Sequence, residues 1–226
     1  MTVTVVGGGV TGCEVCACLA GLVRRQSLPH RLILVHGAGR IAPTLPPGAA
    51  DRIDRHLRLL GVQIMKNERA ESFANGRLHL LSGAEMDTDC LVLATGLHAN
   101  PLVQQIPRHG DAKSPSDGVR AFDTLQTIED PHIFAIGDCA SLEGYSLPRH
   151  GVFAVKSAPI LVDNLIAACF NRGLKSYSPQ TNYLSIINLG DDSAMALWGG
   201  FYWHGRLPMI WKEFLDRRFM QRYRCD

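Results

Sequence analysis

A glycine-rich loop directly after the first apolar run is the feature that most constrains the fold of this chain. Residues 2–6 (TVTVV) are β-branched and typical of a buried strand. Residues 13–25, beyond the loop, carry a helical pattern. The loop has the spacing GxGxxG, with Gly7, Gly9 and Gly12 at the key positions and Gly8 between the first two. A strand, this loop and a helix in succession predict a dinucleotide-binding α/β unit, because free N–H groups at the helix start can face a diphosphate.

Each glycine has a physical reason in such a loop. Gly7 permits the tight turn, Gly9 lets a pyrophosphate approach the backbone, and Gly12 lets the helix pack close to the sheet. The alternative is a glycine-rich turn that binds nothing. The flanking strand and helix favour the nucleotide-binding interpretation.

The first hundred residues continue this pattern. Apolar runs at residues 31–36, 62–65 and 90–94 predict three further strands, and residues 49–60 predict a helix. Turn signals at Asn75-Gly76 and Ser82-Gly83 divide residues 70–89 into a small antiparallel meander. The order predicts the α/β class, with a doubly wound, Rossmann-like parallel sheet and an antiparallel insertion.

The second half is less regular. We expect a connecting loop over residues 100–120, a strand over 133–136 and a long helix over 152–170 that is interrupted near Pro159. A hairpin (183–189 with 194–201) and an amphipathic helix (208–223) then form a small α+β tail.

Composition excludes several classes of protein. The 226 residues are 46% hydrophobic, with 23 basic and 21 acidic side chains, so the chain is neither disordered nor charged enough to indicate nucleic acid as a partner. No run of 18 uncharged apolar residues occurs, which argues against a membrane-spanning helix, and the immediate strand at the N-terminus argues against a signal peptide.

The seven cysteines are odd in number and mostly lie in apolar runs, which indicates reduced thiols and a cytoplasmic location. Cys13 and Cys16 form a CxxC inside a predicted helix without a second ligand pair, so we expect buried small residues and no metal site.

One expected feature of a dinucleotide site is absent. An acidic residue about 20 positions beyond the glycines usually binds the adenosine ribose. This sequence has no Asp or Glu between Glu14 and Asp51; His36 takes the position at the strand end, and Arg40 follows. A neutral or cationic residue there removes repulsion against a 2′-phosphate. The sequence therefore leaves NADH, NADPH and weak binding all open.

Three motifs together resemble the flavin-dependent pyridine nucleotide-disulphide oxidoreductase superfamily. They are VVGGGVTGCE at residues 5–14, LATG at 93–96 and IFAIGD at 133–138. Within the superfamily the chain is most similar to the NADH dehydrogenase-like branch, including forms fused to selenide, water dikinase. The stretches 147–155 and 211–220 also resemble that branch.

The resemblance implies two cofactors, NAD(P)H and FAD, and a place for each. Residues 1–99 would bind the nicotinamide nucleotide, with Glu14 near the nicotinamide and Thr95-Gly96 where the chain crosses back. Residues 100–175 would be the C-terminal part of the flavin domain, and 176–226 the tail. Gly137 and Asp138 would lie at the ribityl or phosphate region of the flavin, and a helix starting near Gly151 and Val152 would point its N–H groups at the flavin ring. No catalytic residue is assigned.

The resemblance also has a large departure. In the family, a first GxGxxG N-terminal to all of this sequence binds the ADP part of FAD, whereas this sequence starts at the second one. We therefore expect weak FAD binding by the chain alone, and an exposed apolar surface that favours a complementing chain or a homo-oligomer.

The predicted C-terminal helix combines aromatic and basic residues over 208–224. Such a helix can lie on an anionic membrane, as in quinone-reducing relatives, or pack its apolar side on the protein's own core. The first alternative places the chain at the inner face of the membrane.

Two functions follow from the sequence. The first is an FAD-dependent oxidoreductase that passes a hydride from NAD(P)H to flavin and onward to an acceptor such as a quinone. The second is a non-catalytic nucleotide-binding remnant or subunit that needs a partner with the missing flavin half. A plain NADP-dependent dehydrogenase ranks last, because no Tyr-x-x-x-Lys pair follows the sheet.

Overall fold

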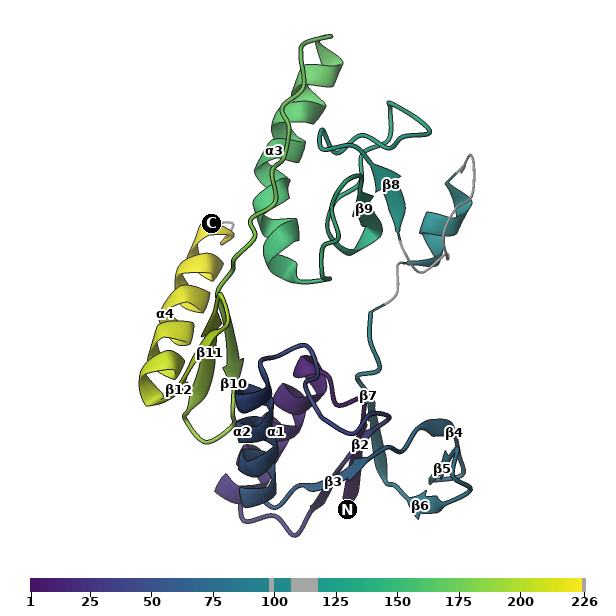
Figure 1. Ribbon diagram of the computed structural model, residues 1–226, viewed down its shortest axis with the longest axis vertical. Coiled ribbons are helices and arrows are strands. Elements are labelled where there is room, and N and C mark those ends of the chain that lie inside the picture. Colours follow the sequence, from purple (N-terminus) through teal and green to yellow (C-terminus); the bar gives the residue numbers. More distant parts are fainter. Residues whose placement is uncertain (98–99, 107–117, 225–226) are drawn as a thin grey trace. The chain divides into compact units, whose positions relative to one another are not determined.

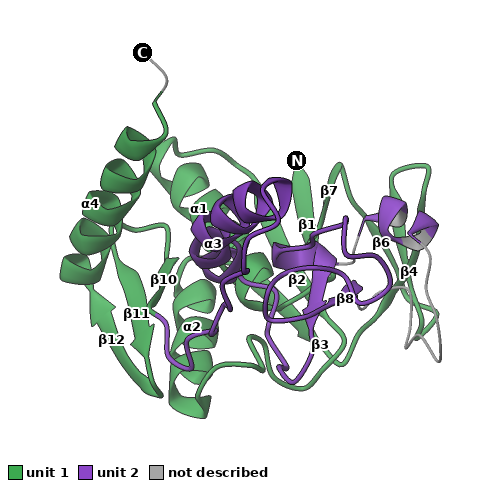
Figure 2. Cartoon of the chain, turned by 90° about the horizontal axis from the view of Figure 1, so that it is seen from above, with its two compact units in different colours: residues 1–96, 184–226 green, residues 97–183 purple. Residues whose placement is uncertain are grey.

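The computed structural model describes residues 1–97, 100–106 and 118–224. The chain divides into two compact units, residues 1–96 with 184–226 (unit 1) and residues 97–183 (unit 2) (Figure 2). Residues 176–226, expected as one tail, are thus shared between the two units. Most of the loop expected at 100–120 lies outside the described residues, as does Cys225.

Unit 1 is built on a parallel sheet with the strand order β3-β2-β1-β7 (Figure 1). The strands are β1 (Thr2–Val6), β2 (Arg31–His36), β3 (Gln63–Lys66) and β7 (Cys90–Leu93). All four were predicted from their apolar runs. Since the predicted meander lies between β3 and β7, the α/β fold with an antiparallel insertion is confirmed.

The two faces of this sheet are covered by different elements. Successive strand residues point to opposite faces. Leu32 and Leu34 of β2 therefore pack in one core cluster with α1 (Val10–Arg25) and α2 (Pro47–Leu59). Ile33 and Val35 pack against the meander. The meander strands are β4 (Ala70–Ala74), β5 (Arg77–Leu80) and β6 (Glu85–Asp87). Covering both faces explains why the parallel strands are almost continuously apolar.

The C-terminal elements belong to unit 1. The expected hairpin is a three-stranded antiparallel sheet, because a further strand follows residues 194–201. Its strands are β10 (Ser185–Asn188), β11 (Ala194–Trp198) and β12 (Phe201–Gly205), followed by α4 (Arg206–Arg222). Ile187 and Met195 of this sheet are buried in the same cluster as α1 and α2. The sheet thus extends the core on the helical side.

The stability of the chain is expected to fall as the pH drops below 6.5, the ordinary pKa of histidine, because of His204 on β12. Arg52 of α2 donates a hydrogen bond to His204 Nδ1 at 3.0 Å, which requires that nitrogen to be unprotonated. Burial, Arg52 and His56 lower the pKa of His204, in that order, and Asp191 opposes them. A histidine with a lowered pKa in the folded state binds a proton more readily when unfolded, so acid favours unfolding from pH 6.5 down to the folded-state pKa.

Urea unfolding curves across this pH range measure the effect. The variant His204→Asn removes the titrating group and should show a shallower loss of stability on acidification. An identical pH dependence in the two proteins would contradict this role of His204.

Unit 2 is smaller and contains α3 (Gly151–Cys169) and a parallel pair of strands, β8 (Val119–Ala121) and β9 (Ala140–Leu142), neither of which was predicted. The described part of unit 2 also contains two short 3-10 helices, η1 (Pro101–Gln105) and η3 (Gly137–Cys139). Its core gathers seven buried residues, which are Val103, Val119, Ala121, Leu125, Ala135, Leu142 and Tyr177.

Two expectations for unit 2 were wrong. Residues 133–136 do not form a strand: they make one isolated bridge, Gln126 to Phe134, because their backbone bonds to the loop around Leu125 and not to a ladder. The long helix is not interrupted at Pro159 but continues through it. Pro159 has no backbone N–H, so the carbonyl group of Val155, one helical turn earlier, loses its hydrogen-bond donor. Val155 is exposed, so water can bond to that carbonyl group instead.

Among the described helices, α3 alone is long and apolar enough to cross a membrane, by length and composition: it has 19 residues and a mean hydropathy of 1.6 over 18 of them. Phe153, Ser157 and Asn164 face the interior of unit 2. The rest of its surface carries exposed apolar side chains, namely Val155, Val162, Leu165 and Ile166, with Phe170 at its C-terminal cap.

Candidate functional site

The glycine loop joins β1 to α1 in a strained, tightly packed conformation. Gly7 has φ +109°, which side-chain-bearing residues rarely adopt. A Cβ on Gly12 would lie 1.7 Å from the Gly7 carbonyl oxygen, so only glycine allows α1 to start this close to the loop. Gly9 is different, since a Cβ there would meet no atom within 4 Å. The loop backbone at Gly9 is therefore open to a ligand.

A cavity of about 600 Å³ lies over this loop in unit 1. Gly7, Gly8, Gly9, His36, Thr95 and Gly96 all line it, together with Pro43, Glu68 and Arg69. Six of the residues expected at the nicotinamide nucleotide thus come together at the C-terminal ends of β1, β2 and β7. Loops at this edge of a parallel sheet are where such folds bind ligands.

His36 is held at both ring nitrogens. The Gly8 N–H donates to its Nδ1 at 3.1 Å, so Nδ1 carries no proton. Its Nε2 therefore donates to the Arg40 carbonyl oxygen at 2.9 Å. These bonds fix a neutral imidazole that connects the glycine loop to residues 37–40.

Glu14 does not line this cavity. Its carboxylate accepts a hydrogen bond from the Asn188 N–H at 2.9 Å, which joins α1 to β10. In this structure Glu14 positions the C-terminal sheet, and its proximity to a nicotinamide stays a prediction.

The CxxC of α1 is buried, as expected. Burial raises the pKa of both Cys13 and Cys16 to about 12, so both remain thiols at neutral pH. Within the described part of the chain, no group of three metal-ligating side chains occurs. The structure therefore supports neither a reactive dithiol nor a metal centre at this motif.

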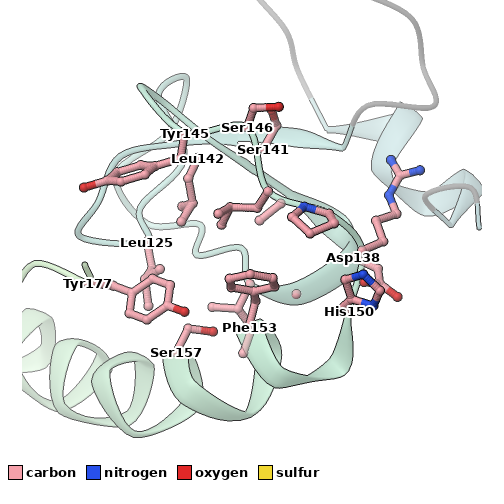
Figure 3. A pocket seen from close by; sticks show the side chains of 16 residues that line it. Leu125, Asp138, Ser141, Leu142, Tyr145, Ser146, His150, Phe153, Ser157 and Tyr177 are labelled. Atoms are coloured by element: carbon pink, nitrogen blue, oxygen red, sulfur yellow. The ribbon is translucent and has the colours of Figure 1, made fainter. Parts of the chain in front are cut away.

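A second cavity, of about 370 Å³, lies within unit 2 (Figure 3). Figure 3 shows Asp138 and His150 at one end and the side chains of Ser157 and Tyr177 at the other. Leu125, Leu142 and Phe153 form apolar parts of its wall. The exposed Asp138 carboxylate has no hydrogen-bond partner among the described residues, so it is free to accept bonds from a ligand.

The start of α3 adds donors to this site. His150 is the N-cap of α3 and lines the cavity, but no side chain caps the helix there. The first N–H groups of a helix lack partners within the helix and carry partial positive charge. Gly151 and Val152 begin the helix without lining the cavity themselves. Gly137 lines the cavity beside Asp138, so the structure brings the expected flavin residues to one region.

The Tyr177 hydroxyl is a polar group that the sequence did not single out. Tyr177 is 4% exposed, and its hydroxyl has no hydrogen-bond partner in the structure. Burial raises its pKa, so it stays a phenol and offers a proton to an acceptor. An unpartnered buried hydroxyl lining a cavity is costly unless a ligand or water satisfies it.

The variant Tyr177→Phe is therefore expected to fold with unchanged or higher stability, because it removes an unsatisfied buried group. It should weaken the affinity for any ligand that accepts the phenol proton, by about tenfold. Thermal unfolding and flavin titration of the two proteins measure the two effects. A large loss of stability in Tyr177→Phe would show that the hydroxyl has a structural role instead.

Fold and cavities together define a class of protein. The cavity of unit 1 offers bare loop amides at a strand-to-helix turn, which fits the diphosphate of a nicotinamide nucleotide. The cavity of unit 2 offers a free carboxylate, a helix N-terminus and an orphaned phenol, which fits the ribityl and ring groups of a flavin. A chain with both sites belongs to the class of flavin- and nicotinamide-dependent oxidoreductases.

Comparison with known proteins assigns the family. The profile of the pyridine nucleotide-disulphide oxidoreductase family matches residues 1–158, and the chain belongs to this family. The members of this family are oxidoreductases that use FAD and NAD(P)H, the cofactors expected from the sequence.

Individual relatives agree with this assignment. The chain is 30% identical over 202 residues to the type II NADH:quinone oxidoreductase of Haemophilus influenzae, covering 83% of this chain and 45% of that protein. It is 25% identical to ferroptosis suppressor protein 1 of Taeniopygia guttata, covering 88% of this chain and 54% of that protein. The chain thus spans about half the length of these relatives.

The structure of NDH2 from Plasmodium falciparum in complex with NADH shares the fold, with a TM-score of 0.78 at 15% identity, covering 96% of this chain and 62% of that one.

Proposed function

We propose that this chain is the nicotinamide-binding portion, with part of the flavin-binding portion, of an FAD-dependent NAD(P)H oxidoreductase. The observation that carries the proposal is the presence of two cavities, one lined by Gly7, Gly8, Gly9, Thr95 and Gly96 and the other by Gly137 and Asp138, which the family resemblance assigns to NAD(P)H and to FAD. The Gly7–Gly9 amides would hold the diphosphate of NAD(P)H. Asp138 would accept bonds from flavin hydroxyls, and the α3 N-terminus and Tyr177 would donate to its ring acceptors. When both cofactors are bound, they supply hydride transfer to the flavin and electron transfer to an acceptor such as a quinone.

An absorbance spectrum of the purified chain tests this proposal. At equilibrium with FAD over a range of concentrations, measured by ultrafiltration, the protein should hold flavin in excess of the free cofactor, and this bound flavin should bleach when NAD(P)H is added without oxygen. The variant Asp138→Asn should retain less flavin than the parent at the same FAD concentration. A protein that stays colourless at every FAD concentration would overturn the flavin part of the proposal.

A second candidate is a nucleotide-binding subunit that needs a complementing chain or a second copy of itself. One observation favours it: α3 exposes a row of apolar side chains. It predicts calorimetric binding of NAD(P)H without dye reduction, and activity only when a polypeptide with the first GxGxxG is added. Turnover by the isolated chain at low concentration, as a monomer, would contradict it.

The C-terminal region supports a peripheral location at the cytoplasmic face of a membrane. In α4 only Pro208 is fully buried, and Met209 and Leu215 are half-buried where the helix contacts the C-terminal sheet. The other apolar residues of this helix are exposed. Exposed aromatic side chains on β12, on α4 and at the C-cap of α4 are Phe201, Tyr202, Trp203, Trp211, Phe214, Phe219 and Tyr223. The same segment carries the basic residues Arg206, Lys212, Arg217, Arg218, Arg222 and Arg224, of which Lys212 and Arg217 pair with Asp216 and Glu213. Aromatic and basic residues together favour an anionic interface, where a quinone acceptor would be available.

Sedimentation with lipid vesicles tests this location. Binding is expected to vesicles that contain anionic lipid, to weaken in high salt, and to fall further in the variant Trp211→Ala. Equal recovery in the supernatant with anionic and with neutral vesicles would exclude the membrane as a partner.

A further inference from the structure

The cavity of unit 1 extends from the glycine loop to the C-terminal end of β2. This is the position where dinucleotide-binding domains distinguish NAD from NADP, by an acidic residue for the ribose 2′-OH or an arginine for the 2′-phosphate. Residues from two segments line this end: His36 ends β2 and is followed by Gly37 and Ala38, and Glu68 and Arg69 follow β3.

His36 cannot take the part of the acidic residue. A ribose hydroxyl would need a free acceptor, but the Gly8 N–H already occupies Nδ1, and Nε2 carries the proton donated to the Arg40 carbonyl. The ring is also neutral in this arrangement, so it does not repel an anion. The end of β2 therefore offers neither an acceptor for a 2′-OH nor a negative charge against a 2′-phosphate.

Arg69 supplies a cation at the same place. A Cβ on Gly37 would lie 2.9 Å from Arg69 Cγ and 3.1 Å from its Nε, so the arginine lies directly over this glycine. The Arg69 guanidinium has no hydrogen bond or ion pair among the described residues. The glycine after β2 thus makes room for an unpaired arginine on the cavity wall. A planar guanidinium can bind a phosphate through two donors.

Two other charged groups bear on this end of the cavity. The Glu68 carboxylate accepts a hydrogen bond from the Ser82 hydroxyl at 2.8 Å through one oxygen, and it keeps its charge and its second oxygen on the cavity wall, which makes Glu68 the competing residue to be tested. Arg40 is paired with Asp51 at 3.9 Å, with both side chains about half exposed, which is a weak contact that a stronger anion can replace. A phosphate at this end would therefore meet one unpaired cation on the cavity wall, Arg69, while Arg40 does not line the cavity.

We propose that this site binds NADP(H) in preference to NAD(H), and that Arg69 is the residue that determines the preference by binding the 2′-phosphate. This inference rests on the proposed binding of a nicotinamide nucleotide by the glycine loop. The inference adds to that function which of the two nicotinamide nucleotides the site prefers.

Calorimetry with the whole chain tests the inference without flavin or turnover. Adenosine 2′,5′-bisphosphate and adenosine 5′-monophosphate differ only in the 2′-phosphate, and NADPH and NADH differ in the same group. We expect the member with the 2′-phosphate to bind at least about tenfold more tightly in each pair, since a charge-assisted phosphate contact is replaced by an unsatisfied hydroxyl. The difference should shrink as salt is added.

Three variants identify the residue. Arg69→Gln should lower the affinity for NADPH about tenfold and leave that for NADH nearly unchanged. Arg77→Gln is the matched control, because Arg77 is an exposed arginine on β5 that does not line the cavity and pairs with Glu85 and Asp87. It should change neither affinity. Glu68→Gln should raise the affinity for NADPH, because it removes a negative charge near the phosphate.

The outcomes separate the two proposals. If none of the four nucleotides binds, the glycine loop does not hold a dinucleotide and the proposed function fails with the inference. If NADH binds as tightly as NADPH or more tightly, the function stands and the inference is overturned. Loss of NADH binding in Glu68→Gln would show that Glu68 holds the ribose, which also overturns it. Far-UV circular dichroism of each variant confirms that an affinity change is not a loss of folding.

Discussion

Replacing Gly12 with alanine is expected to destabilise the chain strongly and to abolish nucleotide binding. The added Cβ would lie 1.7 Å from the Gly7 carbonyl oxygen and 3.4 Å from Ala94 Cβ, so either α1 or the loop must move. The backbone of α1 fixes the position of the added Cβ, and the Gly7 oxygen also belongs to the backbone, so no change of side-chain rotamer can relieve the clash. Overpacking of this kind costs about 3 kcal/mol or more. In a chain of this size that corresponds to a loss of about 10 °C in Tm, which differential scanning calorimetry measures.

The matched control is Gly9→Ala, three residues earlier in the same loop. Its Cβ meets no atom within 4 Å, and Gly9 has φ −68°, so the variant should fold with the stability of the parent. The same Cβ points into the space where the loop is open to a phosphate, so nucleotide affinity should still fall. Equal stability of Gly12→Ala and the parent would show that the loop and α1 are not packed as described. Full nucleotide affinity in Gly9→Ala would place the ligand elsewhere.

The fold of unit 1 could be predicted because short stretches of its sequence specify its strands and turns by themselves. The two central parallel strands, β1 and β2, are buried on both faces and read as runs of apolar residues, such as LILV before His36. Positive-φ residues at Asn75, Gly76 and Gly83 mark the turns of the meander at the dipeptides that the sequence indicated.

Unit 2 lacks such local signals. Its strands β8 and β9 have three residues each, and the segment 133–136 pairs with a loop. A short apolar run does not specify its partner, so the sequence predicts a strand over residues 133–136 where the structure has a loop. Likewise, Pro159 predicts a break, yet an exposed proline in a helix packed along one side leaves the helix continuous.

The residues of the candidate sites also divide into those that the sequence predicted and those that it did not. The glycine loop, His36 and Asp138 stand in motifs whose spacing indicates their chemistry. Arg69 and Tyr177 carry no such spacing; they reach the cavities because β3 ends beside β2 and because residues 175–177 return along α3. Sequence patterns do not record contacts between segments that are far apart. The residues that would select a ligand were therefore visible only in the structure.

Asn164 is the residue that holds this returning segment, and Asn164→Ala is expected to destabilise the chain by about 3–5 kcal/mol. Its side chain is fully buried in the middle of α3. The amide donates to the Thr124 carbonyl at 2.9 Å and to the Lys175 carbonyl at 2.8 Å, and its oxygen accepts from the Lys175 N–H at 2.8 Å. Alanine would leave three partly buried backbone groups without these partners. Urea unfolding followed by far-UV circular dichroism measures the change.

The adjacent variant Asp163→Asn controls for the position on the helix and for Lys175. Asp163 pairs with the Lys175 ammonium at 2.8 Å, but both side chains are about half exposed or more, so its loss should cost less than about 1 kcal/mol. A cost for Asn164→Ala as small as that for Asp163→Asn would mean that the three bonds do not order residues 175–177. Because Tyr177 lies two residues beyond Lys175, the same variant should also displace its hydroxyl from the cavity. Loss of flavin affinity in Asn164→Ala, with affinity retained in Asp163→Asn, would connect the buried amide to the ligand site through this segment.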